Sequence, residues 1–462
     1  MNLFSKFRYA LKDKDWSSAT VPFLCKAILL IIIIGVAARL IIGFFVTFVF
    51  DIYHWGVVIQ NINSGNGLYE MTGYFYTPPW GYLLGLEAFL QDIFGIANIG
   101  ERATDAFLLE NIDGFFTSTI TTIAFAMSIK LLFLVCDIVV GYLIFWIIRD
   151  LTKDKRKAIL GFALWFLCPF VITVGSIIVQ FDTISVMITL LAVIMLRKDR
   201  YIESGVLLCL ATLLKLFPGF FIFLFIAHII SKNREDGTAN KKLIMFFVSI
   251  VVTAFIIFLP QLLDGTLPSA FSFITSRVSE GVGTSTIASI GGYVAICAYV
   301  AAMIVSVLLA LRIKDNRDKE RSDAMLFDAL LVTTAVLFLY PPLPQYVLLL
   351  LPFVIFAMMR DVRYKIPLIL LMVGTTIVTV AGGPMNLAAI ASFTDIIDMN
   401  SVMDMVRAVN SMFLGFTAIQ IFGFAGYAIQ YAGILCVLWI RFGERIKATV
   451  RKITHKENTV QQ

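Results

Sequence analysis

The sequence is poor in charged residues, and this scarcity excludes a water-soluble enzyme. Only 15% of its 462 residues are charged, 59% are apolar, and its mean hydropathy is +0.89. Uncharged apolar runs recur along the whole length, for example at 243–259 and 366–381. Runs of this length predict an integral, multi-pass membrane protein.

Histidine and cysteine are too scarce and too dispersed to build a metal centre. The three histidines and six cysteines show no spacing typical of zinc ligands, and the cysteines fall in or beside predicted helices. A disulfide framework is therefore not expected. Glycine-rich phosphate loops are missing as well. We expect no cofactor and no nucleic-acid partner. A divalent metal, with Gln180 and Asp182 as candidate ligands, stays open as an alternative that no motif indicates.

Basic side chains gather in short segments that alternate with acidic loops. These segments are the N-terminus, 149–157, 197–200, 232–242, 312–321, 360–365 and the tail from Arg441. The intervening loops hold acidic residues such as Asp51, Glu70 and Asp264. By the positive-inside rule both termini are cytoplasmic, the acidic loops face outward, and the number of crossings is even.

The apolar runs predict an all-α bundle of about twelve transmembrane helices. Their approximate ranges are 23–50, 117–148, 158–178, 183–196, 202–216, 218–231, 243–260, 288–311, 325–340, 345–359, 366–382 and 411–440. The pair split at Pro218 is shorter than a usual crossing of ~20 residues, so ten is the alternative count.

The chain is expected to form one membrane domain. We assign 1–22 to a cytoplasmic segment, 23–440 to the transmembrane domain and 441–462 to a basic cytoplasmic tail. The absence of a transit segment and the small loops suit the cytoplasmic membrane of a bacterium or an archaeon.

The first outer loop, 51–116, carries two predicted interfacial helices. In its first part, apolar residues including Ile52 and Trp55 recur at helical spacing, and Asp51 and His54 fall on the neighbouring polar stripe. A second helix, with Trp80, follows a Thr-Pro-Pro turn. We expect both helices to lie in the membrane surface, with Trp55 at headgroup level and Trp80 facing lipid.

Asp51 is the candidate general base. A carboxylate at a membrane boundary beside aromatic residues loses solvation, which raises its pKa toward neutral pH. The alternative is an ordinary solvated loop carboxylate.

Motifs in a fixed order resemble GT-C superfamily glycosyltransferases of the family 87 type, related to the first mannosyltransferase of glycosylphosphatidylinositol assembly. After Asp51 they are Gly-Asn-Gly-Leu-Tyr at 65–69, Tyr-Thr-Pro-Pro at 76–79, an Asp and a Gly within 129–144, the central stretch 166–222, and a Gln-Tyr element within 341–355. The eukaryotic relatives carry two acids separated by one residue in the first loop, whereas this chain offers only Asp51. A two-carboxylate metal site is therefore not expected there.

The resemblance implies a GT-C type helical bundle that transfers a hexose, mannose by analogy, from a polyprenyl phosphate. The acceptor is a lipid or glycan on the extracytoplasmic face, transfer inverts the anomeric centre, and membrane lipids are the other partners. Asp51 takes the acceptor proton, and Lys215 and Arg277 bind the donor phosphate, with Arg102 and Arg39 as further candidates. The candidate sugar- or acceptor-binding residues are His54, Tyr76, Gln180, Asp182, Gln345 and Tyr346.

Several of these residues also have a structural interpretation that involves no role in binding or catalysis. Gln180 and Asp182 lie in a predicted turn, where solvated polar residues are common, and Tyr346 is an interfacial tyrosine. Arg39, Lys130 and Asp137 fall well inside predicted helices, where a charge is costly unless it is paired or functional. Lys130 and Asp137 are candidates for mutual neutralisation, and Arg39 is either a tie to another helix or functional.

A second class of function stays open. A lipid or polysaccharide flippase, without covalent chemistry, would depend on Arg39, Lys130 and Asp137 rather than on Asp51.

Overall fold

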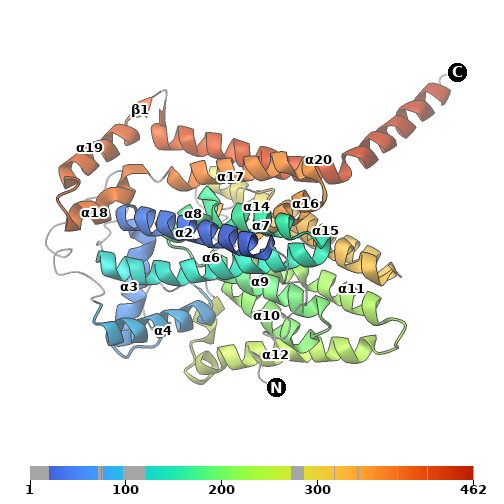
Figure 1. Cartoon of the computed structure of the whole chain (residues 1–462), viewed down its shortest axis with the longest axis horizontal. Coiled ribbons are helices and arrows are strands. Elements are labelled where there is room, and N and C mark those ends of the chain that lie inside the picture. Colours follow the sequence, from blue (N-terminus) through green and yellow to red (C-terminus); the bar gives the residue numbers. More distant parts are fainter. Residues whose placement is uncertain are drawn as a thin grey trace.

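The computed structural model describes residues 20–70, 74, 76–96, 121–271, 286–316, 318–340, 343–381, 383–413 and 415–460. Over these residues the chain is a bundle of helices with one short antiparallel hairpin, formed by β1 (Met412–Phe413) and β2 (Phe416–Thr417). Most of the long helices run along the long axis of the molecule, α3 (Val49–Asn63) stands across it, and the end of α20 projects from the bundle (Figure 1). The predicted all-α membrane fold is confirmed.

Six helices of the described chain are long and apolar enough to cross a membrane. They are α2 (Thr20–Phe45), α6 (Ile123–Thr152), α12 (Ala239–Leu263), α14 (Thr286–Asp315), α17 (Lys365–Val380) together with the preceding turn η4 (Val362–Tyr364), and α20 (Ala418–Val460). A seventh candidate is bent by 42° where α7 (Lys155–Phe166) meets α8 (Pro169–Thr173) and the π-helical turn η1 (Val174–Ile178).

The other predicted spans are shorter helices in the middle of the bundle. They are α9 (Asp182–Arg197), α10 (Tyr201–Leu214), η2 (Phe217–Phe221) with α11 (Ile222–Asn233), α15 (Lys319–Leu337), and η3 (Pro344–Leu349) with α16 (Leu351–Arg360). All twelve predicted segments thus overlap helices. Most of the central ones have fewer residues than a straight crossing needs.

The remaining elements lie at one end of the bundle or in its turns. They are α3 (Val49–Asn63), α4 (Pro78–Phe94), η5 (Gly383–Leu387), α18 (Ala388–Phe393) and α19 (Met399–Asn410). Two prolines open α4, and Gly95 in the left-handed conformation closes it, as is usual for helix starts and stops. In Figure 1, α3, α4, α18, α19 and β1 gather on the left.

The two ends of the bundle differ in charge. Helix α9 begins at Asp182 and ends at Arg197, and α10 returns alongside it toward Lys215. At the far end Arg197 contacts Asp150 at 2.6 Å and Asp323 at 2.8 Å. Lys232 at the end of α11 donates to the Arg197 carbonyl at 2.6 Å, so the basic segments 149–157, 197–200 and 232–242 meet at the end opposite Asp182 and Lys215.

The first span ends earlier than predicted. Residues 46–48 leave the helix because the Thr47 amide donates to the Asn386 carbonyl at 2.8 Å and the Phe48 amide donates to the Ile177 carbonyl at 2.7 Å. The buried Lys130 ammonium caps the end of α2, where it donates to the Gly43 carbonyl at 2.6 Å. Asp51 consequently lies in the first turn of α3 and not at the end of the first span.

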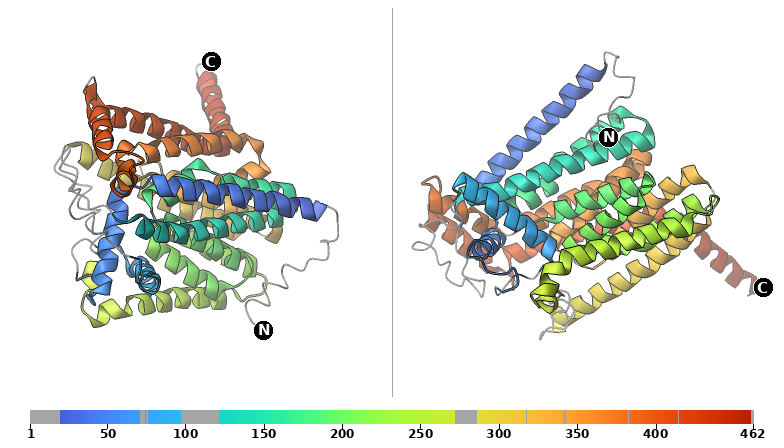
Figure 2. Two further views of the ribbon diagram at one scale, coloured as in Figure 1. Left: turned by 60° about the vertical axis from the view of Figure 1, so that its left-hand side comes forward. Right: turned by 90° about the horizontal axis from the view of Figure 1, so that it is seen from below.

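The surface helices face the protein more than predicted. Trp55 and Trp80 are both buried, at 1% and 0% exposure, in an apolar cluster with Phe133 and Phe181. The expectation that these two indoles lie in the headgroup region or against lipid is wrong. Helix α4 does expose Leu86 and Phe94, while α2 lies along the outside of the bundle (Figure 2).

Candidate active site

The site is organised around an irregular turn between α8 and α9. The chain forms the π-helical turn η1, which the Val179 amide closes by donating to the Val174 carbonyl at 2.9 Å. Val179 then adopts the left-handed conformation with φ of 61°. A β-branched residue is strained in this region, and π-turns and strained residues are frequent at functional sites. Gln180, Phe181 and Asp182 follow directly.

Gln180 holds Asp51 in place. Its side-chain Nε2 donates to Asp51 Oδ2 at 2.8 Å, across 129 residues of sequence. Asp51 is half-buried, and burial raises the pKa of its carboxyl to about 6. The hydrogen bond from Gln180 and the charge of Lys215 act in the opposite direction, and the charge of Asp182 adds to the rise.

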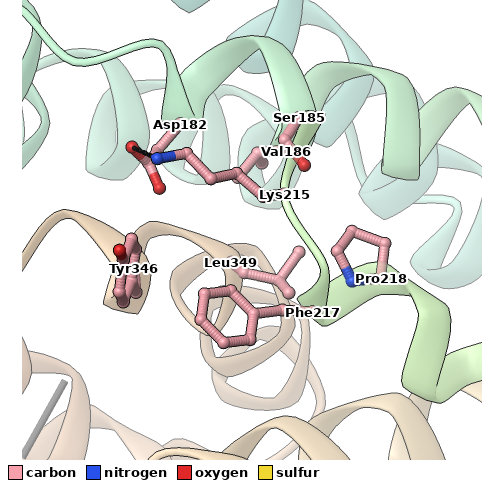
Figure 3. Close-up of a pocket in the computed structure, with 8 residues that line it drawn as sticks. All are labelled: Asp182, Ser185, Val186, Lys215, Phe217, Pro218, Tyr346 and Leu349. Carbon is pink, nitrogen blue, oxygen red and sulfur yellow. Dashed lines mark ion pairs between the residues drawn. The ribbon is translucent and has the colours of Figure 1, made fainter. Parts of the chain in front are cut away.

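Lys215 supplies the positive charge beside this carboxylate. It follows α10 in an extended conformation, just before η2, whose Pro218 prevents the helix from continuing. Its Nζ lies 3.2 Å from Asp182 Oδ2, and both side chains are below 10% exposed. The two residues face each other in Figure 3.

Three aromatic rings surround the Lys215 ammonium. Its Nζ lies 4.1 Å from the ring centre of Phe181, 5.1 Å from that of Tyr346 and 5.3 Å from that of Tyr76. Cation–π contacts of this kind stabilise a buried charge. The cage joins the segment between α3 and α4, the residue before α9, and η3 around one ammonium.

A small pocket lies next to this ammonium. It is lined by Asp182, Ser185, Val186, Lys215, Phe217, Pro218, Tyr346 and Leu349 (Figure 3). Its cavity volume is about 10 Å³, room for about one water molecule and far below the roughly 300–1,000 Å³ of sites that enclose a whole small molecule. One wall is charged and the other is apolar, which suits an anionic headgroup attached to a hydrocarbon.

Hydrogen bonds from its own side chains hold the segment between α3 and α4 next to the site. The Tyr69 hydroxyl donates to the Tyr76 carbonyl at 2.7 Å, and the Tyr74 hydroxyl donates to the Thr77 carbonyl at 2.9 Å. The Thr77 hydroxyl in turn donates to the Leu213 carbonyl, two residues before Lys215. Both sequence motifs of this loop therefore serve to hold Tyr76 beside Lys215.

The structure brings together six of the predicted site residues: Asp51, Tyr76, Gln180, Asp182, Lys215 and Tyr346. His54 lies one helical turn beyond Asp51, with its ring against Trp55 at 5.3 Å. Gln345 is buried in η3 and does not line the pocket. Arg277 and Arg102 lie outside the described residues.

Sequence reasoning missed two residues that shape the site. Phe181 packs on the Lys215 ammonium, and Trp55 donates its indole N–H to the Val179 carbonyl at 3.0 Å. Only the position of Phe181, next to a predicted site residue, hinted at its role.

The buried charges deeper in the bundle hold helices together. Arg39 Nε contacts Asp137 Oδ2 at 2.9 Å, and its Nη1 donates to the Phe166 carbonyl at 2.7 Å. Lys130 caps α2 and forms no ion pair with Asp137 within the described residues. Arg39 thus connects α2 to other helices. The prediction that Lys130 and Asp137 neutralise each other is wrong.

No three histidine, cysteine or acidic side chains come together as a metal site anywhere in the described chain. Asp51 and Asp182 are two carboxylates that influence each other electrostatically, but each is already engaged, by Gln180 and by Lys215 respectively.

Part of the chain is similar to known glycosyltransferases. Residues 115–342 match glycosyltransferase family 87, a range that contains Gln180, Asp182 and Lys215 but neither Asp51 nor Tyr346. GPI mannosyltransferase 1 of Candida albicans is 28% identical over 143 residues, which are 28% of this chain and 36% of that protein. The chain thus spans just over a third of the length of this curated relative.

Proposed function

We propose that this chain, a membrane glycosyltransferase whose residues 115–342 belong to family 87, transfers mannose from a polyprenyl phosphate to a hydroxyl group of a lipid or glycan acceptor. The observation that carries this proposal is the convergence of a carboxylate with a raised pKa, Asp51, and a buried ammonium, Lys215, on the turn Gln180–Asp182. The GPI mannosyltransferase relative supports mannose as the sugar.

The reaction is a single displacement at the anomeric carbon. The acceptor oxygen forms a bond to this carbon from the side opposite the phosphate, and its proton passes to Asp51. The bond between the anomeric carbon and the phosphate oxygen breaks, and the electron pair leaves with polyprenyl phosphate. Because attack and departure take place on opposite sides, the configuration inverts.

Asp51 suits the role of general base. A pKa of about 6 leaves the carboxylate ionised at neutral pH and still basic enough to take a proton in the transition state. Oδ2 is engaged by Gln180, whereas Oδ1 has no hydrogen-bond partner among the described residues. Oδ1 is therefore the atom that accepts the proton.

Lys215 suits the role of phosphate ligand. An ammonium has three N–H donors, and among the described residues this one forms an ion pair with one carboxylate, that of Asp182. The donor phosphate approaches from the pocket, where the apolar wall of Phe217, Pro218 and Leu349 receives the first part of the isoprenoid chain. In a site of low dielectric constant the ammonium stabilises the charge that develops on the departing phosphate.

The tyrosines and neighbouring polar groups complete the proposed site. Tyr76 and Tyr346 lie on the ammonium from two sides, so their hydroxyls suit contacts with sugar hydroxyls. His54 and Gln345 are proposed acceptor or sugar contacts at the edge of this region, and Arg277 is a proposed second phosphate ligand.

The site is proposed to face outward. The basic turns gather at the opposite end of the bundle around Arg197, and by the positive-inside rule that end is cytoplasmic. A flippase would require charges along the path of its cargo, whereas Arg39, Lys130 and Asp137 are engaged in helix contacts. These contacts favour transfer over transport.

The proposal is tested with purified protein in lipid nanodiscs and radiolabelled polyprenyl-phosphate mannose, with the matching glucose and galactose donors beside it. We expect mannose release or transfer, with free polyprenyl phosphate as the second product. If none of the donors is consumed, and reconstituted vesicles instead show movement of the intact donor between leaflets, the chain is a transporter and the proposal is wrong.

A further inference from the structure

Helix α3 contacts the turn between α8 and α9 through two side chains one helical turn apart. Asp51 accepts from the side chain of Gln180 at 2.8 Å, and Trp55 donates from its indole to the carbonyl of Val179 at 3.0 Å. One face of α3 thus contacts both Gln180, whose side chain orients Asp51, and the backbone carbonyl of the preceding residue, Val179.

The backbone at Val179 needs such support. The left-handed conformation is sterically unfavourable for an ordinary L-residue, and a β-branched residue adopts it rarely. Val179 has φ of 61° and is fully buried. Its amide closes the π-turn and its carbonyl accepts from Trp55, so both of its backbone polar groups stabilise this conformation.

The direction of the Gln180 side chain depends on this conformation. If Val179 relaxed to an extended or right-handed conformation, the peptide unit between residues 179 and 180 would rotate and Gln180 would leave Asp51. The Trp55 indole prevents the rotation because its N–H is aimed at the carbonyl of that same peptide unit.

We propose that Trp55 is a positioning residue for the transfer reaction: its indole N–H locks Val179 in the left-handed conformation, which holds Gln180 on Asp51. This inference rests on the proposed function for its kinetic consequences, although the lock itself is independent of the substrate. Packing alone does not explain the hydrogen bond, because Trp80 is buried in the same aromatic cluster and its indole N–H has no partner in the described chain.

The test replaces the indole N–H without changing the shape of the ring. Benzothienylalanine, which carries sulfur in place of the N–H, is incorporated at Trp55, and the same replacement at Trp80 is the matched control. We expect the Trp55 variant to lose roughly tenfold or more in kcat with a smaller change in KM. The kcat of the Trp80 variant should decrease little, because no hydrogen bond is removed there.

The pH profile distinguishes positioning from a general loss of structure. The hydrogen bond from Gln180 lowers the pKa of Asp51, which burial otherwise raises. Its loss should move the acidic limb of kcat to higher pH in the Trp55 variant and, to the same extent, in Gln180→Leu. An unchanged limb would overturn the proposal.

Val179→Gly provides a rescue, because glycine adopts the left-handed conformation without steric cost. In the Trp55 variant this substitution should restore most of the lost kcat, and it should restore nothing in Gln180→Leu. If Val179→Gly fails to rescue the Trp55 variant, the lock at residue 179 is refuted.

A second readout does not depend on the reaction. The decrease in Tm caused by benzothienylalanine at Trp55 should be smaller in the Val179→Gly background than in the natural one, since glycine needs no lock. Equal decreases in both backgrounds would contradict the inference. Should no polyprenyl-phosphate sugar be a substrate of the natural protein, the proposed function fails while this Tm comparison still decides the role of Trp55.

Discussion

The ion pair between Lys215 and Asp182 allows stability and catalysis to be separated. Lys215→Met removes the ammonium and leaves the carboxylate of Asp182 buried at 5% exposure without a cation beside it. Breaking a buried pair by removing one partner costs about 3–5 kcal/mol, because an uncompensated charge stays behind. Lys215→Met should therefore unfold at a clearly lower temperature than the natural protein.

Neutralising the second partner should restore stability but not activity. In Lys215→Met/Asp182→Asn no charge is left unpaired, and a neutral pair of similar volume is often as stable as the buried ion pair. The phosphate ligand is still missing, so transfer should stay about 10²–10³ times slower than in the natural protein, the loss typical for one removed oxyanion ligand.

The assay is thermal unfolding of the purified variants in nanodiscs together with donor consumption under single-turnover conditions. A matched control is Arg200→Met, which removes a cation from a pair with Glu203 that is more than 40% exposed, so it should change neither quantity greatly. If the double variant regains both stability and activity, Lys215 serves only to neutralise Asp182, and its assignment to the phosphate is refuted.

Three further predictions concern Asp51 and the interior of the bundle. Because Asp51 must be ionised to accept a proton, kcat should fall about tenfold per pH unit below about pH 6, and a rate that is flat down to pH 5 would contradict its role. Because burial raises the pKa of this carboxyl from 3.8 to about 6, its ionisation destabilises the fold above pH 6. Asp51→Asn should therefore raise the unfolding temperature at pH 8 and leave it nearly unchanged at about pH 3, where the carboxyl is protonated in both the folded and the unfolded state. Arg39→Met should destabilise the bundle by about 3–5 kcal/mol and Arg39→Met/Asp137→Leu should recover most of this loss, as measured by thermal unfolding; no recovery would mean that Arg39 acts beyond the pair.

Local sequence patterns predicted the helices well because apolar runs and breaking residues act over short distances. Every predicted span overlaps a helix, and Pro218 does end the preceding segment, which leaves Lys215 in an extended conformation. The two helices of the first outer loop were also predicted from their periodicity and from the Thr-Pro-Pro turn.

The same patterns failed where the chain contacts distant residues. Trp55 and Trp80 belong to apolar stripes, but an apolar stripe packs equally well against lipid and against protein, so burial of the two indoles was not predictable. The break at residues 46–48 depends on backbone bonds to Ile177 and Asn386, far along the chain.

In the candidate site, too, the identities of the residues were predictable from the sequence, but their arrangement in space was not. The identities of Asp51, Gln180, Asp182 and Lys215 came from motif resemblance and from the rarity of charges away from the basic clusters. Their convergence depends on the π-turn and on the left-handed Val179, conformations that no local propensity favours for a valine. Long-range contacts with α3 hold them in place.

The most direct measurement is the single-turnover release of mannose from radiolabelled polyprenyl-phosphate mannose by Asp51→Asn, beside the natural protein and Asp404→Asn. Asp404 lies on α19, and its side chain is 74% exposed, so this control removes a carboxylate without touching the candidate site. The account predicts that the natural protein and Asp404→Asn consume the donor at similar rates, whereas Asp51→Asn folds, binds the donor and releases sugar at least about 10²-fold more slowly. A fully active Asp51→Asn would contradict it.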